Sequence, residues 1–420
     1  MGTTLDTFAG LSEIDANPID WDSLSNHAYL NPRLPEQDTK RLRSLVESVS
    51  DQFRAHVFLL SSGTSGGVGQ DLKWVALSKA ALLTSAIEVN RHLKSDSGVS
   101  TSKSTAFSSK DVWLHVLPDF HVGGLGIRAR SYLSGAKVVR LSLWDPKEFV
   151  SLAISHDVTL ASLVPAQVYD LVQNGLKSPA SMRAVLVGGG ALAPSLRLKA
   201  RELGWPLLIT YGMTEACSQI ATSSLDSALN SSLAPELELL PHWAARPCGD
   251  GRIQIQGDSL FTAYVYSGSK GEAVVWDPRE DGWFSPQDIV SIEGRKLEVL
   301  GRTQDLIKIG GENVDLARLR LILENIKTEI NLIADIALIS VPDARLGHVI
   351  HLVSDRSLTN ECASALIEIF NQRVVAFERI RKWSRLELLP RTSLGKFISN
   401  HESLLSMGTE GTFEVSPSLN

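Results

Sequence analysis

Short apolar runs alternate with amphipathic stretches through the first half of the chain. A proline after Asp145 predicts a helix that reaches His156, and Pro194 predicts the start of another. Strands separated by helices are typical of βαβ units, so we expect a mainly parallel sheet here. The runs that we interpret as its strands are 112–117, 137–141, 159–164, 184–187 and 207–209.

The pattern changes after Arg246. Alternating apolar and polar positions with glycine turns at 252–258 and 289–300 predict a β-rich subdomain. Beyond Gly301 the chain returns to a mixed pattern, with helical periods over 316–326 and 361–377 and a strand over 336–341. We therefore predict an α/β fold with a large N-terminal domain, 1–303, and a small C-terminal α+β domain, 304–420. Serine-rich stretches at 95–110 and 223–235 predict surface loops.

Composition restricts the classes of function. The 420 residues are 43% hydrophobic and 21% charged, which is typical of a globular protein, and the formal net charge of -6 gives no reason to expect nucleic-acid binding. No apolar run approaches the roughly 18 residues of a membrane span, so we expect no stable membrane insertion. The N-terminal stretch has no signal pattern, and the three cysteines are far apart. These features predict a cytoplasmic protein.

The most informative motif follows the apolar run at 207–209. Residues 210–219 read Thr-Tyr-Gly-Met-Thr-Glu-Ala-Cys-Ser-Gln, which places hydroxyls and one carboxylate where we expect the strand to end. Ligands of open α/β sheets bind at the carboxyl ends of strands. Taken alone, however, Thr214 and Glu215 are more often a helix cap than a catalytic pair.

A second motif follows the apolar run at 57–60. Residues 61–69 form a loop of glycines and hydroxyls, which can wrap phosphate oxygens because backbone N–H groups approach an anion closely there. The alternative is a flexible surface turn. A Walker-type loop is excluded, because it needs Gly-Lys-Ser/Thr after four intervening residues and Val68 and Gly69 occupy the first two of these places.

Two further motifs lie nearer the C-terminus. Lys396 follows a loop that contains Pro390 and Gly395, and its ammonium could neutralise an oxyanion, although a solvated surface lysine is the commoner case. Residues 301–314 follow a Trp-Phe-Ser-Pro-Gln-Asp stretch. Asp288 and Arg302 of this region could bracket the hydroxyls of a sugar.

Taken in order, these stretches resemble the adenylate-forming superfamily of acyl- and aryl-CoA synthetases, adenylation domains and luciferases. The resemblance extends from Phe58 to Asn400, and five motifs occur in the family's order. It implies the adenylate-forming fold with a mobile C-terminal domain. Within the superfamily, the run ending in Ser218 and Gln219, together with the Pro-Asp-Phe-His segment at 118–121, is similar to the 2-succinylbenzoate-CoA ligases of menaquinone biosynthesis.

The resemblance implies ATP, Mg²⁺ and coenzyme A as cofactor and co-substrates, and it implies a role for each motif residue. Thr214 would contact the α-phosphate, Glu215 would ligate Mg²⁺, and Asp288 and Arg302 would bind the ribose. Lys396 would bridge the attacking carboxylate and the α-phosphate during adenylation. Residues implied in binding the β- and γ-phosphates are Ser61, Ser62, Gly63, Thr64, Ser65 and Gly66, with help from Lys73; those implied around adenine are Gly188, Gly189, Gly190 and Tyr211, with Gly212 and Met213 beside them.

The resemblance also implies an acid pocket and a second step. His121, Ser218 and Gln219 are the candidate contacts of a carboxylic acid substrate. A hinge near Gln304 and Asp305 would rotate the small domain, bringing the loop at 308–312 to the site for thioester formation.

Departures from the family pattern leave alternatives open. About sixty residues precede the phosphate loop, so the N-terminal subdomain is shorter than in most relatives. Ser399 stands where the last motif usually has an arginine, and Gln304 stands at the hinge. The alternatives are therefore a ligase for another acid or for a carrier protein, and a nucleotide-binding homologue without turnover. A homodimer that shields the exposed flank is a further open prediction.

Overall fold

The fold is taken from a computed structural model that describes residues 19–61, 73–94, 109–225, 236–391, 397 and 412–414. Its largest element is a nine-stranded sheet with the order β15-β16-β10-β9-β8-β7-β6-β4-β5. The part from β8 to β5 is parallel, and the remaining pairs are antiparallel. The strands are β4 Val112–His115, β5 Lys137–Arg140, β6 Leu160–Leu163, β7 Ala184–Val187, β8 Leu207–Met213, β9 Ser218–Ser223, β10 Leu237–Leu239, β15 Asp288–Glu293 and β16 Lys296–Arg302.

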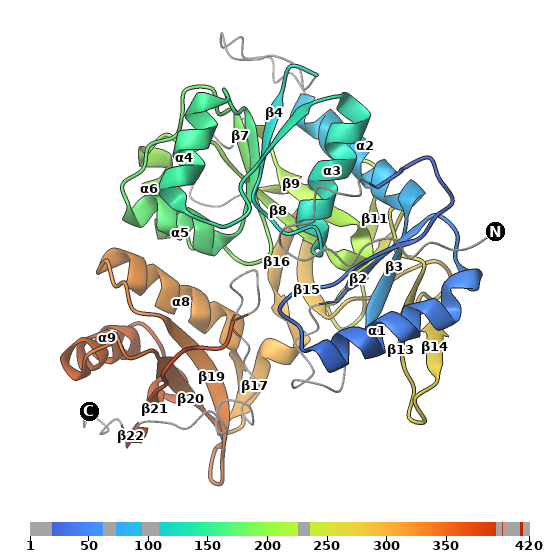
Figure 1. The fold of residues 1–420 in the computed structure, drawn as a ribbon. Helices are drawn as coiled ribbons and strands as arrows, with labels where there is room; N and C mark the ends of the chain where they lie inside the picture. The colour runs from blue at the N-terminus through green and yellow to red at the C-terminus, as the bar shows by residue number, and fades with distance from the viewer. Residues whose placement is uncertain are drawn as a thin grey trace.

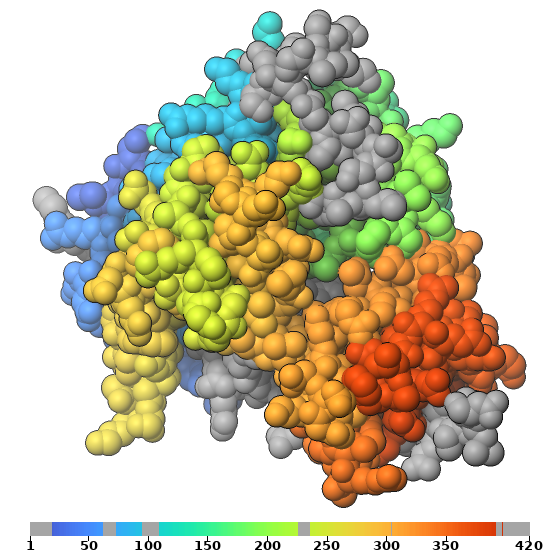
Figure 2. Space-filling model, turned by 180° about the vertical axis from the view of Figure 1, so that it is seen from behind, coloured from blue at the N-terminus to red at the C-terminus, as the bar shows by residue number. Residues whose placement is uncertain are grey.

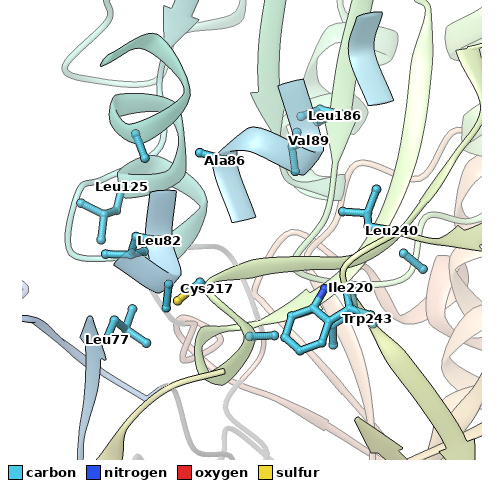
Figure 3. Packing of buried hydrophobic residues seen from close by; sticks show 14 of the residues in the cluster. Leu77, Leu82, Ala86, Val89, Leu125, Leu186, Cys217, Ile220, Leu240 and Trp243 are labelled. Atoms are coloured by element: carbon cyan, nitrogen blue, oxygen red, sulfur yellow. The ribbon is translucent and has the colours of Figure 1, made fainter. Parts of the chain in front are cut away.

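Helices cover both faces of this sheet (Figure 1). One face packs on α2 Lys79–Lys94 and α3 Val122–Ser134, and the other on α4 Pro146–Ser155, α5 Pro165–Gln173 and α6 Pro194–Glu202. Figure 3 shows Leu82 of α2 and Leu125 of α3 near Cys217, which follows β8, and Ile220 of β9 beside Trp243. The core therefore reaches the segment that carries the central motif.

A second sheet joins the N-terminal strands to strands that follow Arg246. Its order is β1-β2-β3-β13-β14, and α1 Glu36–Val49, followed by η1 Ser50–Gln52, packs near β13 and β14. The strands are β1 His27–Tyr29, β2 His56–Leu60, β3 Trp74–Ser78, β13 Ala263–Ser267 and β14 Ala273–Trp276; β11 Ala244–Pro247 and β12 Ile253–Gln256 form a two-stranded sheet. The β-rich region thus shares its strands among three sheets.

The C-terminal region has a core of its own. This core is built mainly on α8 Leu316–Glu329, α9 Asn360–Gln372 and one four-stranded sheet. The other elements are η3 Thr303–Asp305, β17 Leu306–Ile309, β18 Glu312–Asp315, β19 Ile336–Asp343, β20 Gly347–Ser354, η4 Ala376–Glu378, β21 Ile380–Arg385 and β22 Thr412–Glu414. The predicted boundary between residues 303 and 304 stays a prediction, and this separate core supports it.

The C-terminal region rests against the parallel-sheet side of the large region, as Figures 1 and 2 show. The Tyr169 hydroxyl on α5 donates to the carbonyl of Leu332 at 2.6 Å. On α6, the Ser195 hydroxyl lies 2.8 Å from Asn325 Oδ1, and Lys199 Nζ lies 2.7 Å from the Thr328 carbonyl. Specific polar contacts therefore hold the orientation in which the two regions are seen.

Most of the predicted elements are confirmed, with two corrections. The strands expected in the parallel sheet are all present, and Asp145 caps α4 through hydrogen bonds to two backbone N–H groups. However, β8 does not end at Ile209; it continues to Met213 because β9 pairs with it antiparallel. The helix expected over 361–377 ends at Gln372. Most of the two predicted loops lies outside the described residues.

Within the described ranges, no helix combines the length and the apolar character needed to cross a membrane.

Candidate functional site

A pocket of about 400 Å³ opens at the carboxyl ends of β6, β7 and β8. It is the place where an open parallel sheet normally binds a ligand. Its walls include most of the described residues that the sequence singled out. Among the lining residues are Ser61, Lys73, His121, Arg130, Ser162, Gly188, Gly189, Thr210, Gly212, Met213, Thr214, Glu215, Ser218, Gln219, Tyr264, Trp276, Asp288 and Arg302.

The glycines after β7 have a steric role. A Cβ on Gly188 would lie 2.5 Å from Thr210 Oγ1, so this position accepts no side chain without displacing Thr210. Gly189 has a φ of 80°, which glycine adopts without strain. Both line the pocket, whereas Gly190 is not among the lining residues. The backbone here can therefore approach a flat ligand closely.

The central motif folds back tightly on itself. A Cβ on Gly212 would lie only 1.6 Å from the carbonyl oxygen of Ser218, so only glycine permits this approach. After the short η2 turn, Thr214–Ala216, the backbone of Cys217 has a φ of 50° and that of Ser218 a φ of 109°. Positive φ at non-glycine residues stores strain, which is common at functional sites. Thr214 does not cap an α-helix, so the helix-cap alternative for Thr214 and Glu215 does not apply.

Glu215 is held from two sides. Its backbone carbonyl accepts a hydrogen bond from the N–H of Phe261 at 2.8 Å. Its Oε1 accepts one from the hydroxyl of Tyr264, also at 2.8 Å. Tyr264 itself lines the pocket and is only 4% exposed. The carboxylate is therefore fixed in place, with its other oxygen available to a ligand.

Asp288 is the second carboxylate of the pocket and is 4% exposed. Its Oδ2 accepts a hydrogen bond from the Tyr211 hydroxyl at 2.9 Å, and its Oδ1 accepts one from Arg302 Nε at 2.7 Å. The structure thus brings the two predicted ribose-binding residues together. Tyr211 does not itself line the pocket, because its ring packs against the core. Its predicted contact with adenine stays a prediction.

The phosphate loop is described only at its two ends. The Ser61 N–H donates to the carbonyl of Lys73 at 3.0 Å, so the two ends lie side by side at the pocket. Ser61 is buried, and its Oγ has no hydrogen-bond partner among the described residues. The predicted residues Ser62, Gly63, Thr64, Ser65 and Gly66 lie outside the described residues, as does Lys396.

The other end of the pocket is where we predicted the acid to bind. His121 lies directly before α3 and lines the pocket, together with Ser218 and Gln219. Gln219 is 4% exposed, and its Oε1 accepts a hydrogen bond from the Thr222 hydroxyl at 2.7 Å. A Cβ on Gly124 would lie 2.3 Å from the Pro118 carbonyl, so the turn before α3 requires this glycine. All three predicted acid contacts therefore line this pocket.

Arg130 is the main pocket residue that the sequence interpretation missed. Its side chain is only 2% exposed, and one of its terminal nitrogens lies 3.3 Å from Ser218 Oγ. Its Nε has no hydrogen-bond partner, and no carboxylate in the described part of the chain pairs with it. Burial lowers the pKa of the guanidinium to about 10, so it is still charged at neutral pH. One sequence signal was available: Arg130 lies seven residues after Gly123, on the same helix face.

A buried ionic network supports the acid end. Asp119 accepts two hydrogen bonds from Arg128, at 2.8 and 2.7 Å, and one from Arg140 at 3.2 Å. Burial disfavours the Asp119 carboxylate, but the bond from Arg128 and the nearby positive charges prevail and lower its pKa. Burial also lowers the pKa of the adjacent His115 to about 4. This network anchors the turn between β4 and α3, on which His121 lies.

The donor set at Glu215 fits magnesium that arrives with a nucleotide. Among the described residues there is no cluster of three His, Cys, Asp or Glu side chains that could hold a metal alone. Mg²⁺ in nucleotide sites typically uses one or two carboxylates and completes its shell with phosphate oxygens and water. Glu215, as a pocket carboxylate with one oxygen engaged by Tyr264, supplies that type of ligand.

The comparisons with known proteins agree with this geometry. Similar sequences include the 2-succinylbenzoate–CoA ligase of Staphylococcus epidermidis, which is 29% identical over 317 residues, 73% of this chain and 64% of that protein. The enzyme of the same name from Bacillus subtilis (strain 168) is 29% identical over 315 residues, covering 72% and 63%. The matched region thus spans less than two thirds of the length of these curated relatives.

Solved structures show the same fold. The B. subtilis o-succinylbenzoate CoA synthetase in complex with its acyl-adenylate intermediate has a TM-score of 0.72 at 22% identity, covering 90% of this chain and 83% of that one. The Escherichia coli enzyme, as a variant with a bound OSB-AMS, has a TM-score of 0.65 at 22% identity and covers 86% and 79%. The family model described as AMP-binding enzyme matches residues 19–278, which is more than half of the chain. The chain therefore belongs to the AMP-binding enzyme family.

Proposed function

We propose that this protein is an ATP-dependent acid–CoA ligase of menaquinone biosynthesis that activates 2-succinylbenzoate. The observation that carries the proposal is Arg130, a buried guanidinium at the acid end of the pocket with which no carboxylate of the described residues pairs. A buried charge is costly unless an opposite charge meets it. A dicarboxylic acid supplies that charge with one carboxylate while the other is activated. The names of the curated relatives support the same substrate.

In the first step, an oxygen of the acid's free carboxylate attacks the α-phosphorus of ATP, and pyrophosphate leaves. Negative charge accumulates around the α-phosphate, and donors aimed at that charge accelerate such reactions. In our proposal Thr214 contacts the α-phosphate, and Asp288 and Arg302 bind the ribose. The loop from Ser61 to Gly66 holds the β- and γ-phosphates.

Two positively charged groups complete this step. Mg²⁺, when bound, neutralises phosphate charge and is held by Glu215. Lys396 bridges the attacking carboxylate and the α-phosphate. Five positions before it in the sequence, Arg391 forms an ion pair with Asp335. This ion pair ties Arg391 to the C-terminal region.

In the second step, the thiol sulfur of coenzyme A attacks the acyl carbon, its proton passes to solvent, and AMP leaves. We propose that the C-terminal region rotates about Gln304 and Asp305 and brings the loop at 308–312 to the pocket. Asp305 forms an ion pair with Arg320 at 2.7 Å, so the hinge is tied to α8 in the orientation seen here. Hinges absorb such rotations in a few residues.

A panel of carboxylic acids with ATP and Mg²⁺, with and without coenzyme A, tests the proposal when acyl-AMP and acyl-CoA are identified by mass spectrometry. We expect 2-succinylbenzoate to give both products. Acyl-AMP from a different acid would overturn the substrate assignment but keep the chemistry. Acyl-AMP without transfer to coenzyme A would favour a carrier protein as acceptor. Nucleotide binding without any acyl-AMP would leave only a binding protein.

The predicted cytoplasmic location and the predicted homodimer stay proposals. Size-exclusion chromatography with light scattering tests the homodimer, for which a mass near 91 kDa is expected from the chain mass of 45.7 kDa.

A further inference from the structure

Tyr264 lies at the nucleotide end of the pocket, the end where we propose that ATP binds. It connects two parts of this end that are far apart in sequence. It lies on β13, the fourth strand of the five-stranded sheet, between β3 and β14. Its hydroxyl donates to Glu215 Oε1 at 2.8 Å. Its ring lies under the ammonium of Lys73, with 3.7 Å between Nζ and the ring centroid. All three side chains line the pocket.

The contact with Glu215 restricts the carboxylate more than a single hydrogen bond would suggest. Phe261, three residues before Tyr264, holds the backbone carbonyl of Glu215 through its N–H. The main chain and the side chain of Glu215 are therefore both tied to one short segment, 261–264. A carboxylate held in this way presents one free oxygen in a fixed position, as a metal that demands regular geometry requires.

The contact with Lys73 reaches the phosphate loop. Lys73 ends this loop, and its carbonyl accepts the hydrogen bond from the N–H of Ser61, where the loop begins. A cation over an aromatic ring within about 6 Å of the centroid is attracted by the ring. The ring of Tyr264 therefore supports the closing residue of the loop, while its hydroxyl supports Glu215.

We propose that Tyr264 is a positioning residue that couples Lys73 to Glu215, the proposed magnesium ligand. It sets the orientation of Glu215 toward the metal and supports the ammonium of Lys73 at the pocket. This inference rests on the proposed function, because it assumes that Mg²⁺ enters the pocket with ATP. It adds a residue that none of the sequence motifs contained.

The variant Tyr264→Phe removes the hydroxyl and keeps the ring. We expect the tightening of ATP binding by Mg²⁺ to fall by about tenfold, because a hydrogen bond to a charged group is lost. ATP binding in EDTA should be unchanged, since the ring still supports Lys73. Isothermal titration calorimetry with ATP at a series of MgCl₂ concentrations measures both quantities without turnover.

Tyr266→Phe is the matched control, because Tyr266 lies two residues further along the same strand and does not line the pocket. It should behave as the wild type. Tyr264→Leu removes the ring as well, and we expect it to weaken ATP binding in EDTA too. Melting temperatures of all variants show whether they are folded.

The outcomes separate this inference from the proposed function. If Mg²⁺ does not tighten ATP binding to the wild-type protein, the proposed function and this inference both fail. If the wild type responds to Mg²⁺ and Tyr264→Phe responds equally, only the positioning role of Tyr264 is overturned.

Discussion

The two ends of the pocket differ in how their charges are satisfied. At the nucleotide end, both carboxylates have partners within the chain: Tyr264 donates to Glu215, and Tyr211 and Arg302 donate to Asp288. At the acid end, Arg130 is buried against Ser218 and Trp113, and none of the described residues places a carboxylate beside it. Within the described part of the chain, the carboxylates of one end are therefore paired, whereas the guanidinium of the other end is not.

This difference separates what is general in the site from what is specific. Any enzyme that binds ATP in this way benefits from carboxylates that are already oriented, since preorganised groups need no rearrangement during reaction. A buried charge without a partner destabilises the folded protein, so its presence indicates a ligand that supplies the opposite charge. The acid end therefore carries the proposal for the substrate class, and the nucleotide end carries the proposal for the reaction.

The largest expected effect concerns the chemical step at the nucleotide end. Lys396→Ala should reduce acyl-AMP formation by about 10²- to 10³-fold, the usual cost of removing a group aimed at developing charge. Binding of ATP should persist, because the carboxylates and their tyrosines remain. Pyrophosphate release and ATP titration measure the two effects. Lys270→Ala, at an exposed position, is the control, and unchanged pyrophosphate release in Lys396→Ala would remove this assignment.

The next effect concerns the stability cost of the acid end. Arg130→Met keeps most of the side-chain volume and removes the buried charge, so we expect the free energy of unfolding without substrate to rise by about 2 kcal/mol. The same variant should lose activity on a dicarboxylic acid. Urea unfolding of both proteins measures the change. A less stable variant would mean that the guanidinium stabilises the fold, and the comparison between the two ends would fail.

A smaller effect is expected at the ribose-binding pair. Asp288→Asn removes the charge that Arg302 and Tyr211 contact, and we expect the KM for ATP to rise by about tenfold. If Asp288 binds the ribose hydroxyls, the wild type should prefer ATP over 2′-deoxy-ATP and the variant should lose that preference. A preference that survives in Asp288→Asn would show that the ribose is bound elsewhere.

The smallest effect concerns the ionic network beneath the acid end. His115 has a pKa of about 4 in the folded protein, below its ordinary value of 6.5, and it lies near Asp119, Arg128 and Arg140. The unfolded chain binds this proton at a higher pH than the folded protein does. The contribution of His115 to stability is therefore complete above pH 6.5 and is lost as the pH falls toward 4. Between pH 7.5 and 5.5 we expect this group to lower the free energy of unfolding by roughly 1 kcal/mol.

Urea unfolding of the wild type and of His115→Gln at these two pH values tests this prediction. The variant should lose less stability than the wild type over the interval. Equal losses in the two proteins would show that His115 does not contribute to the acid sensitivity.

The sequence predicted the strands and the local motif better than it predicted contacts between distant residues, for a physical reason. The parallel strands have continuous apolar runs bounded by turn residues, and the motif at 210–219 is local, so both are visible along the chain. The extension of β8 to Met213 depends on pairing with β9, which local pattern does not reveal. The local pattern also did not reveal that α9 ends at Gln372.

Arg130 and Tyr264 were missed because their roles depend on distant contacts. Arg130 meets Ser218 across 88 positions of sequence, and Tyr264 meets Glu215 across 49. Each appears locally as an ordinary residue of an element: one arginine on a helix, one tyrosine in an apolar strand. Only the fold shows that both reach the pocket.

The central claim is that Arg130 binds the second carboxylate of a dicarboxylic acid. The most direct test is the ratio of kcat/KM for 2-succinylbenzoate to that for the analogue whose non-activated carboxylate is converted to an amide, measured in the wild type and in Arg130→Met. We predict that the wild type prefers the dicarboxylate by about 10²-fold, in line with truncation of a buried charge pair, and that the variant loses this preference. A preference of equal size in both proteins, or none in the wild type, would contradict the account.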